Sequence, residues 1–370
     1  MQSMLISGLL TIGFLLTQSQ YLNANEKCTH PIPVCAWEKR IVGIKTPNMI
    51  ASGLILDNGL IVTNRHVTED HKSLRIKLAS GLIVEAQPIP NDHAADLTLL
   101  EFVNPTEFPD IIRLHNGSEQ ELTVVAFDQG RNGSRIYPKG TFAIYPDWSR
   151  HPQARVHTDA FALPGNSGGA VITSEGDLVG ILASGDGSIN EVIPAGLMTP
   201  VISVSAEKHR TGYLERGAAI RKCADLLYES EKIPKSPPSA LVSNLKASCL
   251  KSRNKQLYDQ AGQLFGKWWM FRLSKMFLKE SIKMDPNSPN TLMSLAVAYH
   301  LNREYAEEKP ILSRYLELNP SDPQALRLSV QVAGALQDRK LADRAISLMR
   351  LHNPNAVELA EEFLGNAFAN

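Results

Sequence analysis

The stretch Thr158-Asp-Ala-Phe-Ala-Leu-Pro-Gly-Asn-Ser-Gly-Gly169 places a serine, Ser167, inside a glycine-rich turn. Glycine tolerates backbone conformations that other residues avoid, so such a turn can fold tightly enough for two N–H groups to point into one pocket. Two donors aimed at one point stabilise the oxyanion that forms when a serine hydroxyl attacks an acyl carbon. The stretch therefore predicts Ser167 as a nucleophile, and Gly165 and Ser167 as the donors of an oxyanion hole.

Two upstream segments supply the groups that a nucleophilic serine needs. Ile61-Val-Thr-Asn-Arg-His-Val67 places His66 just past the end of an apolar run, and Ala95-Asp-Leu-Thr-Leu-Leu100 places Asp96 at the start of another. A serine is activated by a neighbouring imidazole, and a carboxylate holds that imidazole in the right tautomer. The sequence thus predicts His66 as the general base and Asp96 as the residue that orients it.

From about residue 40 to 204, short apolar runs are broken by Gly, Pro, Asn and Asp. This pattern predicts many short β-strands, arranged as a barrel or sandwich. Residues 41–44 predict the first strand. Asn58-Gly59 lies between two apolar runs and predicts a tight hairpin turn in which both residues take positive φ.

The segments TNRHV (63–67), DLTLL (96–100) and TDAFALPGNSGG (158–169) resemble those of the chymotrypsin superfamily, most closely its bacterial HtrA/Deg-like branch. The resemblance implies an all-β double-barrel trypsin-like protease domain, which we expect at residues 37–207. It also implies a serine endopeptidase that acts on a protein or peptide substrate and needs no cofactor or metal. HtrA/Deg-like proteins usually carry PDZ domains next, and no comparable strand-rich segment follows here.

The same resemblance implies where the substrate side chain before the scissile bond would bind. Phe161 and Ala162 would form the base of that pocket, Ala183-Ser184-Gly185 one wall, and Ala195-Gly-Leu197 would lie near the other. None of these residues is acidic. A pocket without a carboxylate does not offset the desolvation of a Lys or Arg side chain, so we expect cleavage after small or medium apolar residues.

Two other interpretations of these stretches are less consistent with the sequence. Lys39-Arg-Ile-Val-Gly43 resembles the activation site of trypsin zymogens, but the Asp that would pair with a freed amine is replaced by Asn166. We therefore expect no such switch. Gly165–Gly169 also fits the GxSxG elbow of an α/β-hydrolase, which requires a helix after its serine. The residues that follow, Ala170-Val-Ile-Thr173 and then a turn, predict strand-turn-strand instead.

The C-terminal part has a different composition, with long stretches rich in Ala, Leu, Lys and Glu. We expect a helical connector and Pro-rich linker over 208–249, because residues 233–239 contain three prolines. Beyond it, a turn motif recurs every 34 residues, at Asp285-Pro286, Asn319-Pro320 and Asn353-Pro354. This spacing is the tetratricopeptide period and predicts an all-α tetratricopeptide-like solenoid over 250–370. An unrelated helical bundle is the alternative.

Charge and the N-terminal segment limit the partners and the compartment. The chain has 38 basic and 38 acidic residues, so it lacks the positive field that nucleic-acid binding needs, and we expect no nucleic-acid partner. Met4–Leu16 is apolar but shorter than the roughly 20 residues of a spanning helix. Residues 1–24 therefore predict a signal peptide and a periplasmic or secreted protein. A membrane is involved only if this segment stays uncleaved.

The four cysteines fit an oxidising compartment. Short loops close at the least entropic cost, which favours the pairs Cys28–Cys35 and Cys223–Cys249. Free or buried thiols are the alternative. The cysteines and histidines show no spacing typical of a metal site.

Two functions from different classes remain open at this point. The first is an exported serine endopeptidase whose helical repeats recruit a substrate or a partner protein. On this hypothesis, deleting residues 240–370 should impair processing of a native partner while sparing hydrolysis of a small peptide. The second is a catalytically latent scaffold that binds peptides or partner proteins through its repeats.

Overall fold

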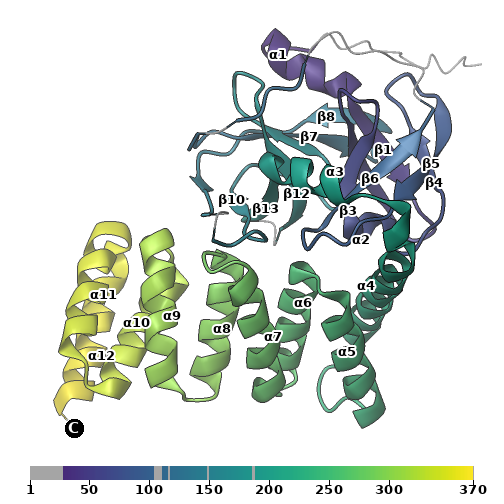
Figure 1. Ribbon diagram of the computed structural model, residues 1–370. Helices are drawn as coiled ribbons and strands as arrows, with labels where there is room; N and C mark the ends of the chain where they lie inside the picture. The colour runs from purple at the N-terminus through teal and green to yellow at the C-terminus, as the bar shows by residue number, and fades with distance from the viewer. Residues whose placement is uncertain (1–27, 104–110, 116, 148–149, 186–187, 370) are drawn as a thin grey trace, which may run out of the picture.

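The computed structural model describes residues 28–103, 111–115, 117–147, 150–185 and 188–369. The predicted signal peptide lies outside these ranges. A β-rich region is followed by a row of helices that runs beneath it, and α4 (Arg210–Ser230) joins the two at one end (Figure 1). Within the described ranges, no helix is long and apolar enough to cross a membrane.

The first sheet is a closed barrel with the strand order β1-β2-β3-β6-β5-β4 and antiparallel neighbours throughout. Its interior is filled by buried branched residues such as Val42, Ile44, Ile55 and Ile61, which suit a pleated and enclosed surface. The first strand begins at Ile41, as predicted. The six strands are β1 (Ile41–Lys45), β2 (Ile50–Ile55), β3 (Ile61–Asn64), β4 (Leu74–Lys77), β5 (Ile83–Ile89) and β6 (Leu97–Phe102).

The predicted turn at Asn58-Gly59 does join β2 to β3, but its conformation differs from the expectation. Leu56 and Leu60 pair across it, with the Leu56 N–H 2.8 Å from the Leu60 oxygen. Gly59 has φ of 80°, whereas Asn58 is not among the residues with positive φ. The loop is longer than a two-residue turn and needs positive φ only at Gly59. The prediction of positive φ at both Asn58 and Gly59 was therefore wrong.

The second sheet has seven strands in the order β8-β7-β11-β12-β13-β10-β9 and does not close among the described residues. The expected second barrel is thus replaced by a sheet with two edges, β8 and β9. Between these edges the carboxylate of Asp159 accepts the N–H groups of Thr141 and Phe142, which removes donors that a ladder would use. The strands are β7 (Thr123–Asp128), β8 (Gly133–Ile136), β9 (Ala143–Ile144), β10 (Val156–Thr158), β11 (Ala170–Ile172), β12 (Leu178–Gly185) and β13 (Asn190–Pro194).

Short helices precede, interrupt and follow the two sheets. Among them, α2 directly follows β3 and α3 leads toward the helical region. They are α1 (Ile32–Cys35), η1 (Ala36–Lys39), α2 (Arg65–Thr68), η2 (Ala195–Leu197), α3 (Met198–Val204) and η3 (Glu207–His209).

The helical region repeats with a fixed period. The side chains of Asn254, Ser288 and Asp322 cap three helices that each begin one residue later, and these caps lie 34 residues apart. The period read from the turn motifs is therefore a period of helix pairs. The helices are α5 (Ser239–Ser252), α6 (Lys255–Lys267), α7 (Phe271–Met284), α8 (Pro289–Leu301), α9 (Tyr305–Leu318), α10 (Pro323–Leu336), α11 (Arg339–His352), η4 (Pro354–Ala356) and α12 (Val357–Ala369).

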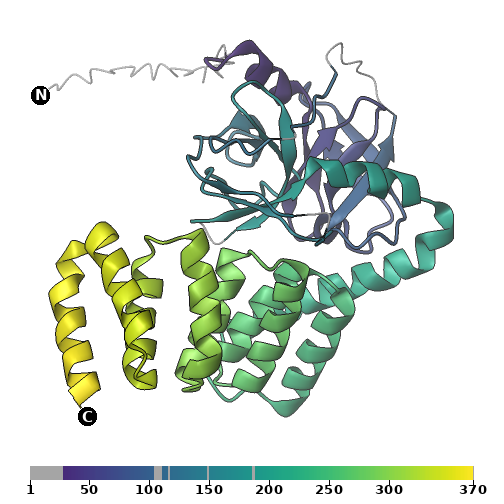
Figure 2. The same ribbon diagram turned by 60° about the vertical axis from the view of Figure 1, so that its left-hand side comes forward.

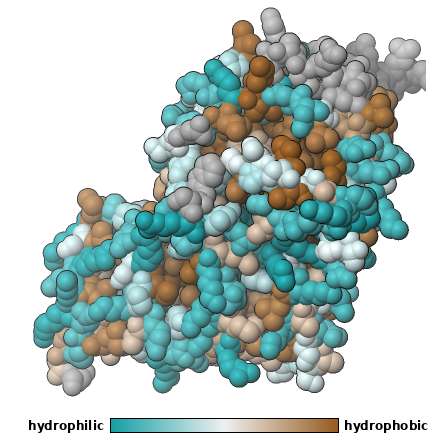
Figure 3. Space-filling model, in the orientation of Figure 1, coloured by the Kyte–Doolittle hydropathy of each residue, from teal (hydrophilic) through white to brown (hydrophobic). Residues whose placement is uncertain are grey.

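Disulfides join the predicted pairs, Cys28–Cys35 and Cys223–Cys249. The second links α4 to α5, so the Pro-rich segment 233–239 lies in the loop of a cross-linked helical hairpin. The row of helices extends past the β-rich region, and α10 to α12 project away from it in both views (Figures 1 and 2). On the face shown in Figure 3, hydrophilic side chains cover most of the helical region, and brown surface gathers over the β-rich part.

Candidate active site

The predicted nucleophile loop is held between the two sheets by close backbone contacts. Gly168 has φ of +89°, and a Cβ at this position would lie 1.9 Å from the Ser52 oxygen, so only glycine fits. The Ser52 N–H donates to the Ser167 oxygen at 2.8 Å, and its hydroxyl donates to the Gly165 oxygen at 3.3 Å. Strand β2 of the barrel thus positions the loop that leads into β11 of the sheet.

Asn166 fixes the same loop from the other side. Its Nδ2 donates to the Phe127 oxygen and to the Tyr137 hydroxyl, both at 3.0 Å, and its Oδ1 accepts the Leu163 N–H at 2.7 Å. The nitrogen and the oxygen of the Asn166 side chain therefore both make hydrogen bonds that hold the turn. A strand follows Ser167, namely β11, so the α/β-hydrolase elbow is wrong for this chain.

His66 and Asp96 meet at the open ends of β3 and β6, where the sequence places them. The His66 Nδ1–H donates to Asp96 Oδ2 at 2.6 Å, and the His66 backbone N–H donates to Oδ1 at 3.0 Å. The Asp96 side chain is only 3% exposed. Burial alone would raise the pKa of Asp96, but His66 and Arg155 outweigh it and hold the pKa below its usual value. Asp96 is therefore a buried carboxylate that fixes the imidazole by two hydrogen bonds.

The Ser167 hydroxyl is hydrogen-bonded to a backbone oxygen instead of to this pair. Its Oγ donates to the Ala183 oxygen at 2.9 Å, and no hydrogen bond joins it to His66 among the residues that the structure describes. Activation by the imidazole would require Oγ to exchange the Ala183 oxygen for His66 as its acceptor. The N–H groups of Gly165 and Ser167 have no acceptor within the described part of the chain, so both are free to bind an oxyanion.

A cleft of about 560 Å³ contains both His66 and Ser167. Of the expected substrate-binding residues, Ala162, Ser184 and Gly185 line it. Ala183 is fully buried, and its carbonyl oxygen accepts the hydrogen bond from Ser167 Oγ.

The prediction that Phe161 forms the base of the pocket stays a prediction. Phe161 is 44% exposed but is not among the residues that line this cleft, and its ring centre lies 6.0 Å from that of Tyr137. Residues 195–197 are not lining residues either, because they form η2, whose Ala195 and Leu197 are buried in the core. Ala162, Ser184 and Gly185 are thus the predicted substrate-binding residues that line this cleft.

Four lining residues were not singled out by the sequence: Met49, Leu182, Asn190 and Gln256. Asn190 lies on β13, and its Nδ2 donates to the Ala160 oxygen at 2.8 Å. Gln256 comes from α6, so the helical region contributes directly to the cleft.

The residue next to the histidine links the site to α4. Arg65 is only 1% exposed, and its guanidinium lies 3.5 Å from the centre of the Tyr213 ring. It donates to the backbone oxygens of Glu69 and Tyr213, and the Tyr213 hydroxyl bonds Thr68 Oγ1 at 2.9 Å. The short helix that carries His66 is thus packed and hydrogen-bonded against the first long helix of the helical region.

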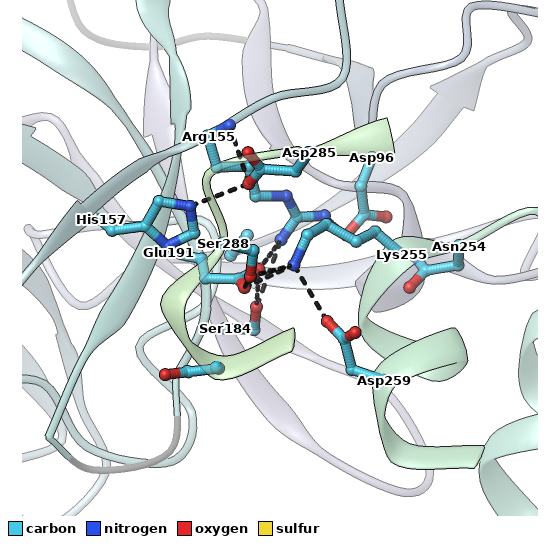
Figure 4. A network of polar contacts seen from close by, with 12 residues as sticks. Asp96, Arg155, His157, Ser184, Glu191, Asn254, Lys255, Asp259, Asp285 and Ser288 are labelled. Atoms are coloured by element: carbon cyan, nitrogen blue, oxygen red, sulfur yellow. Dashed lines mark hydrogen bonds and ion pairs between the residues drawn. The ribbon is translucent and has the colours of Figure 1, made fainter. Parts of the chain in front are cut away.

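A second connection is a buried chain of charges between β13, β10 and α6 (Figure 4). Lys255 Nζ lies 2.6 Å from Glu191 Oε1, and Arg155 Nη1 lies 3.0 Å from Glu191 Oε2. Arg155 Nη2 is 4.0 Å from Asp96 Oδ2, and Arg155 also donates to the Ser184 hydroxyl at 3.2 Å. Burial opposes ionisation of Glu191, yet Lys255 and Arg155 hold its pKa well below the usual range. The chain of ion pairs runs from the helical region to the carboxylate that orients His66.

The repeated turn motif also takes part in this interface. Asp285, which begins the first of the three motifs, accepts from His157 Nε2 at 2.8 Å and from the Arg155 backbone N–H at 3.3 Å. Both His157 and Asp285 have fully buried side chains. Burial opposes ionisation of Asp285, but the contact with His157 holds its pKa below the usual value. The sequence marks Asp285 only as a landmark of the repeat.

Comparisons with known proteins assign part of the chain. Residues 51–181 match the family model of the trypsin-like peptidase domain. The chain is 30% identical over 179 residues to the serine endoprotease DegS of Salmonella typhimurium, and 32% identical over 132 residues to the serine protease Do-like HtrA of Lactobacillus helveticus. These alignments cover 46% and 33% of this chain, and 50% and 32% of those relatives.

Among solved structures, the serine endoprotease from Yersinia pestis shares 25% identity over 46% of this chain and 64% of that chain, with a TM-score of 0.40. The chain thus spans about half the length of DegS and about a third of the length of the Lactobacillus helveticus relative. The family match ends before η2 and includes none of the helices from α3 onward.

Proposed function

We propose that this chain, which carries a trypsin-like peptidase domain over residues 51–181, is a serine endopeptidase. The observation that supports the proposal most strongly is the 2.6 Å hydrogen bond between His66 Nδ1 and Asp96 Oδ2, in a cleft that His66 shares with Ser167. This bond leaves His66 Nε2 as the acceptor of the imidazole. A general base therefore faces the cleft beside a serine.

The reaction follows from these positions. Ser167 rotates from the Ala183 oxygen to His66, and Oγ attacks the scissile carbonyl carbon while Nε2 takes its proton. The N–H groups of Gly165 and Ser167 bind the developing oxyanion. Each donor of this kind raises the rate by a factor of about 10²–10³. His66 then protonates the leaving amine, and a water activated by the same nitrogen hydrolyses the acyl-enzyme.

Casein digestion tests both the activity and the side-chain preference. We expect the chain to cleave casein, and Ser167→Ala to abolish cleavage, since no other group replaces Oγ. Mass spectrometry of the fragments should show cleavage after small or medium apolar residues, because the lining residues of the cleft that the structure describes include no carboxylate. Fragments that end mainly in Lys or Arg would contradict the stated preference, and equal digestion by Ser167→Ala would contradict the activity.

A second candidate function is a latent scaffold that binds peptides without cutting them. The orientation of the Ser167 hydroxyl favours it, since Oγ donates to the Ala183 oxygen at 2.9 Å instead of to the base. Catalytic hydrogen bonds often form only when substrate binds, so this orientation does not exclude catalysis. The scaffold hypothesis predicts peptide binding without turnover.

The setting of the enzyme is part of the proposal. The two disulfides support an oxidising compartment, and with the signal peptide predicted at 1–24 they favour a periplasmic or secreted protein. The 34-residue period of helix pairs supports a tetratricopeptide-like region that binds a partner protein or substrate. The proposed domains are 37–207 for the protease, 208–249 for the connector and 250–370 for the repeats.

A further inference from the structure

Gln256 is the second residue of α6, yet it lines the cleft together with His66, Ser167 and Ser184. Its place there depends on tertiary structure alone, because the family match ends at residue 181. The helical region therefore contributes Gln256 to one wall of the cleft.

The Gln256 side chain has an unused hydrogen-bonding group. Its Oε1 is buried and has no hydrogen-bond donor among the described residues. A buried amide oxygen without a donor costs free energy, and a ligand that supplies the donor recovers it. At a cleft that holds the candidate nucleophile, the ligand with such a donor would be the substrate.

The position of Gln256 is fixed by its neighbours on both sides. Asn254 caps α6 by accepting the Leu257 N–H at 3.1 Å, and Lys255 is held by Glu191 at 2.6 Å. Glu191 adjoins Asn190, which lines the same cleft from β13. The start of α6 is thus attached to the strand opposite it, which holds the backbone of Gln256 at the cleft.

The charges nearby favour a neutral donor. Among the described residues near this wall, the carboxylates of Glu191 and Asp259 are paired with Lys255, and that of Asp96 is paired with His66. A Lys or Arg of the substrate would therefore be desolvated against an amide oxygen alone, which is unfavourable. Removing a neutral hydroxyl or carboxamide from water costs much less free energy.

We propose that Gln256 is a specificity-determining residue, whose Oε1 accepts a hydrogen bond from a Ser, Thr or Asn side chain of the substrate within three residues of the scissile bond. This inference rests on the proposed peptidase function and adds a substrate class to it. The helical region then acts in selection at the site itself.

Quenched fluorescent peptides test the proposal, with each position from P3 to P2′ set in turn to Ser, Thr or Asn and to Ala or Val. The unmodified chain should prefer the donor at one position by about 5–10-fold in kcat/KM, as expected for one hydrogen bond. Gln256→Leu should lose this preference, so that its kcat/KM for the donor peptide equals its kcat/KM for the Ala or Val peptide. Gln260→Leu is the matched control, since Gln260 is an exposed residue one turn further along α6, and it should behave like the unmodified chain.

Gln256→Glu provides a second variant of nearly the same shape. A carboxylate at this place should move the preference at the same position toward Lys or Arg. The proposal is overturned if Gln256→Leu keeps the preference of the unmodified chain, or if the unmodified chain shows no preference at any position.

A binding assay separates this proposal from the peptidase function. The same peptides, labelled with fluorescein, are titrated into the Ser167→Ala chain with and without Gln256→Leu, and anisotropy is measured. A donor preference in binding that disappears with Gln256→Leu supports the role of Gln256 even if the unmodified chain cleaves nothing. Equal binding of donor and non-donor peptides by both chains would contradict that role even if cleavage occurs.

Discussion

Replacing Asp96 by asparagine should lower kcat for peptide hydrolysis about 10⁴-fold, the loss typical of this change in Ser-His-Asp enzymes. The geometry gives the reason. Oδ1 accepts the His66 backbone N–H at 3.0 Å, so an asparagine would keep its oxygen there and turn its NH₂ toward Nδ1. Nδ1 would then have to accept, and the proton would move to Nε2. An imidazole with a proton on Nε2 cannot take one from Ser167.

Asp92→Asn is the control for this change. Asp92 precedes β6 in the same loop, is largely exposed, and pairs with His209 at 3.2 Å. It should leave kcat within about twofold, because exposed ion pairs contribute little. Retention of more than a tenth of kcat by Asp96→Asn, with an unchanged Tm, would show that Asp96 does not orient the base.

Lys255→Met should lower the free energy of unfolding by about 3–5 kcal/mol, the usual cost of breaking a buried ion pair on one side. Lys255 is 2% exposed in its side chain and contacts both Glu191 and Asp259, at 2.6 and 2.9 Å. Methionine fills a similar volume, so the loss comes from two carboxylates that lose a cation. Denaturant unfolding followed by fluorescence of the buried Trp268 measures it.

The matched control is Lys283→Met on α7. Lys283 pairs with Glu280 on the same helix, and their side chains are 70% and 40% exposed. We expect a change below about 1 kcal/mol. If Lys255→Met unfolded no more easily than Lys283→Met, the chain of charges would not hold the helical region to the protease domain.

The same contacts change the expectation for a chain without residues 240–370. That deletion removes Lys255 and Asp285, which takes one of two paired cations from Glu191 and leaves His157 without its carboxylate. It also removes Gln256 from the cleft. We therefore expect hydrolysis of small peptides to fall together with processing of a protein substrate, in contrast to the separation expected for a detachable recruitment module.

The sequence predicted the parts of the site that depend on local pattern. His66 and Asp96 lie at strand ends because apolar runs mark β3 and β6, and the glycines around Ser167 mark the turn. The 34-residue spacing likewise corresponds to the observed period of helix pairs. These features depend on patterns of residues along the chain, so a single sequence shows them.

The remaining features depend on contacts between distant segments. Gln256 looks like an ordinary polar residue of an amphipathic helix, and only the attachment of α6 to β13 brings it to the cleft. Arg65 and Tyr213 are far apart in sequence and stack in the fold. For Phe161, the resemblance implies a place in the chain but not whether its side chain turns into the cleft, so its role stays a prediction.

The most direct test of the central claim is the site of fluorophosphonate labelling. Such a probe reacts with a serine only when a neighbouring base activates it. The full chain is incubated with the probe, and the modified residue is identified by peptide mass mapping. Labelling confined to Ser167, absent from Ser167→Ala and strongly reduced in Asp96→Asn, is the expected result. No labelling of the unmodified chain would contradict the account and favour the latent scaffold.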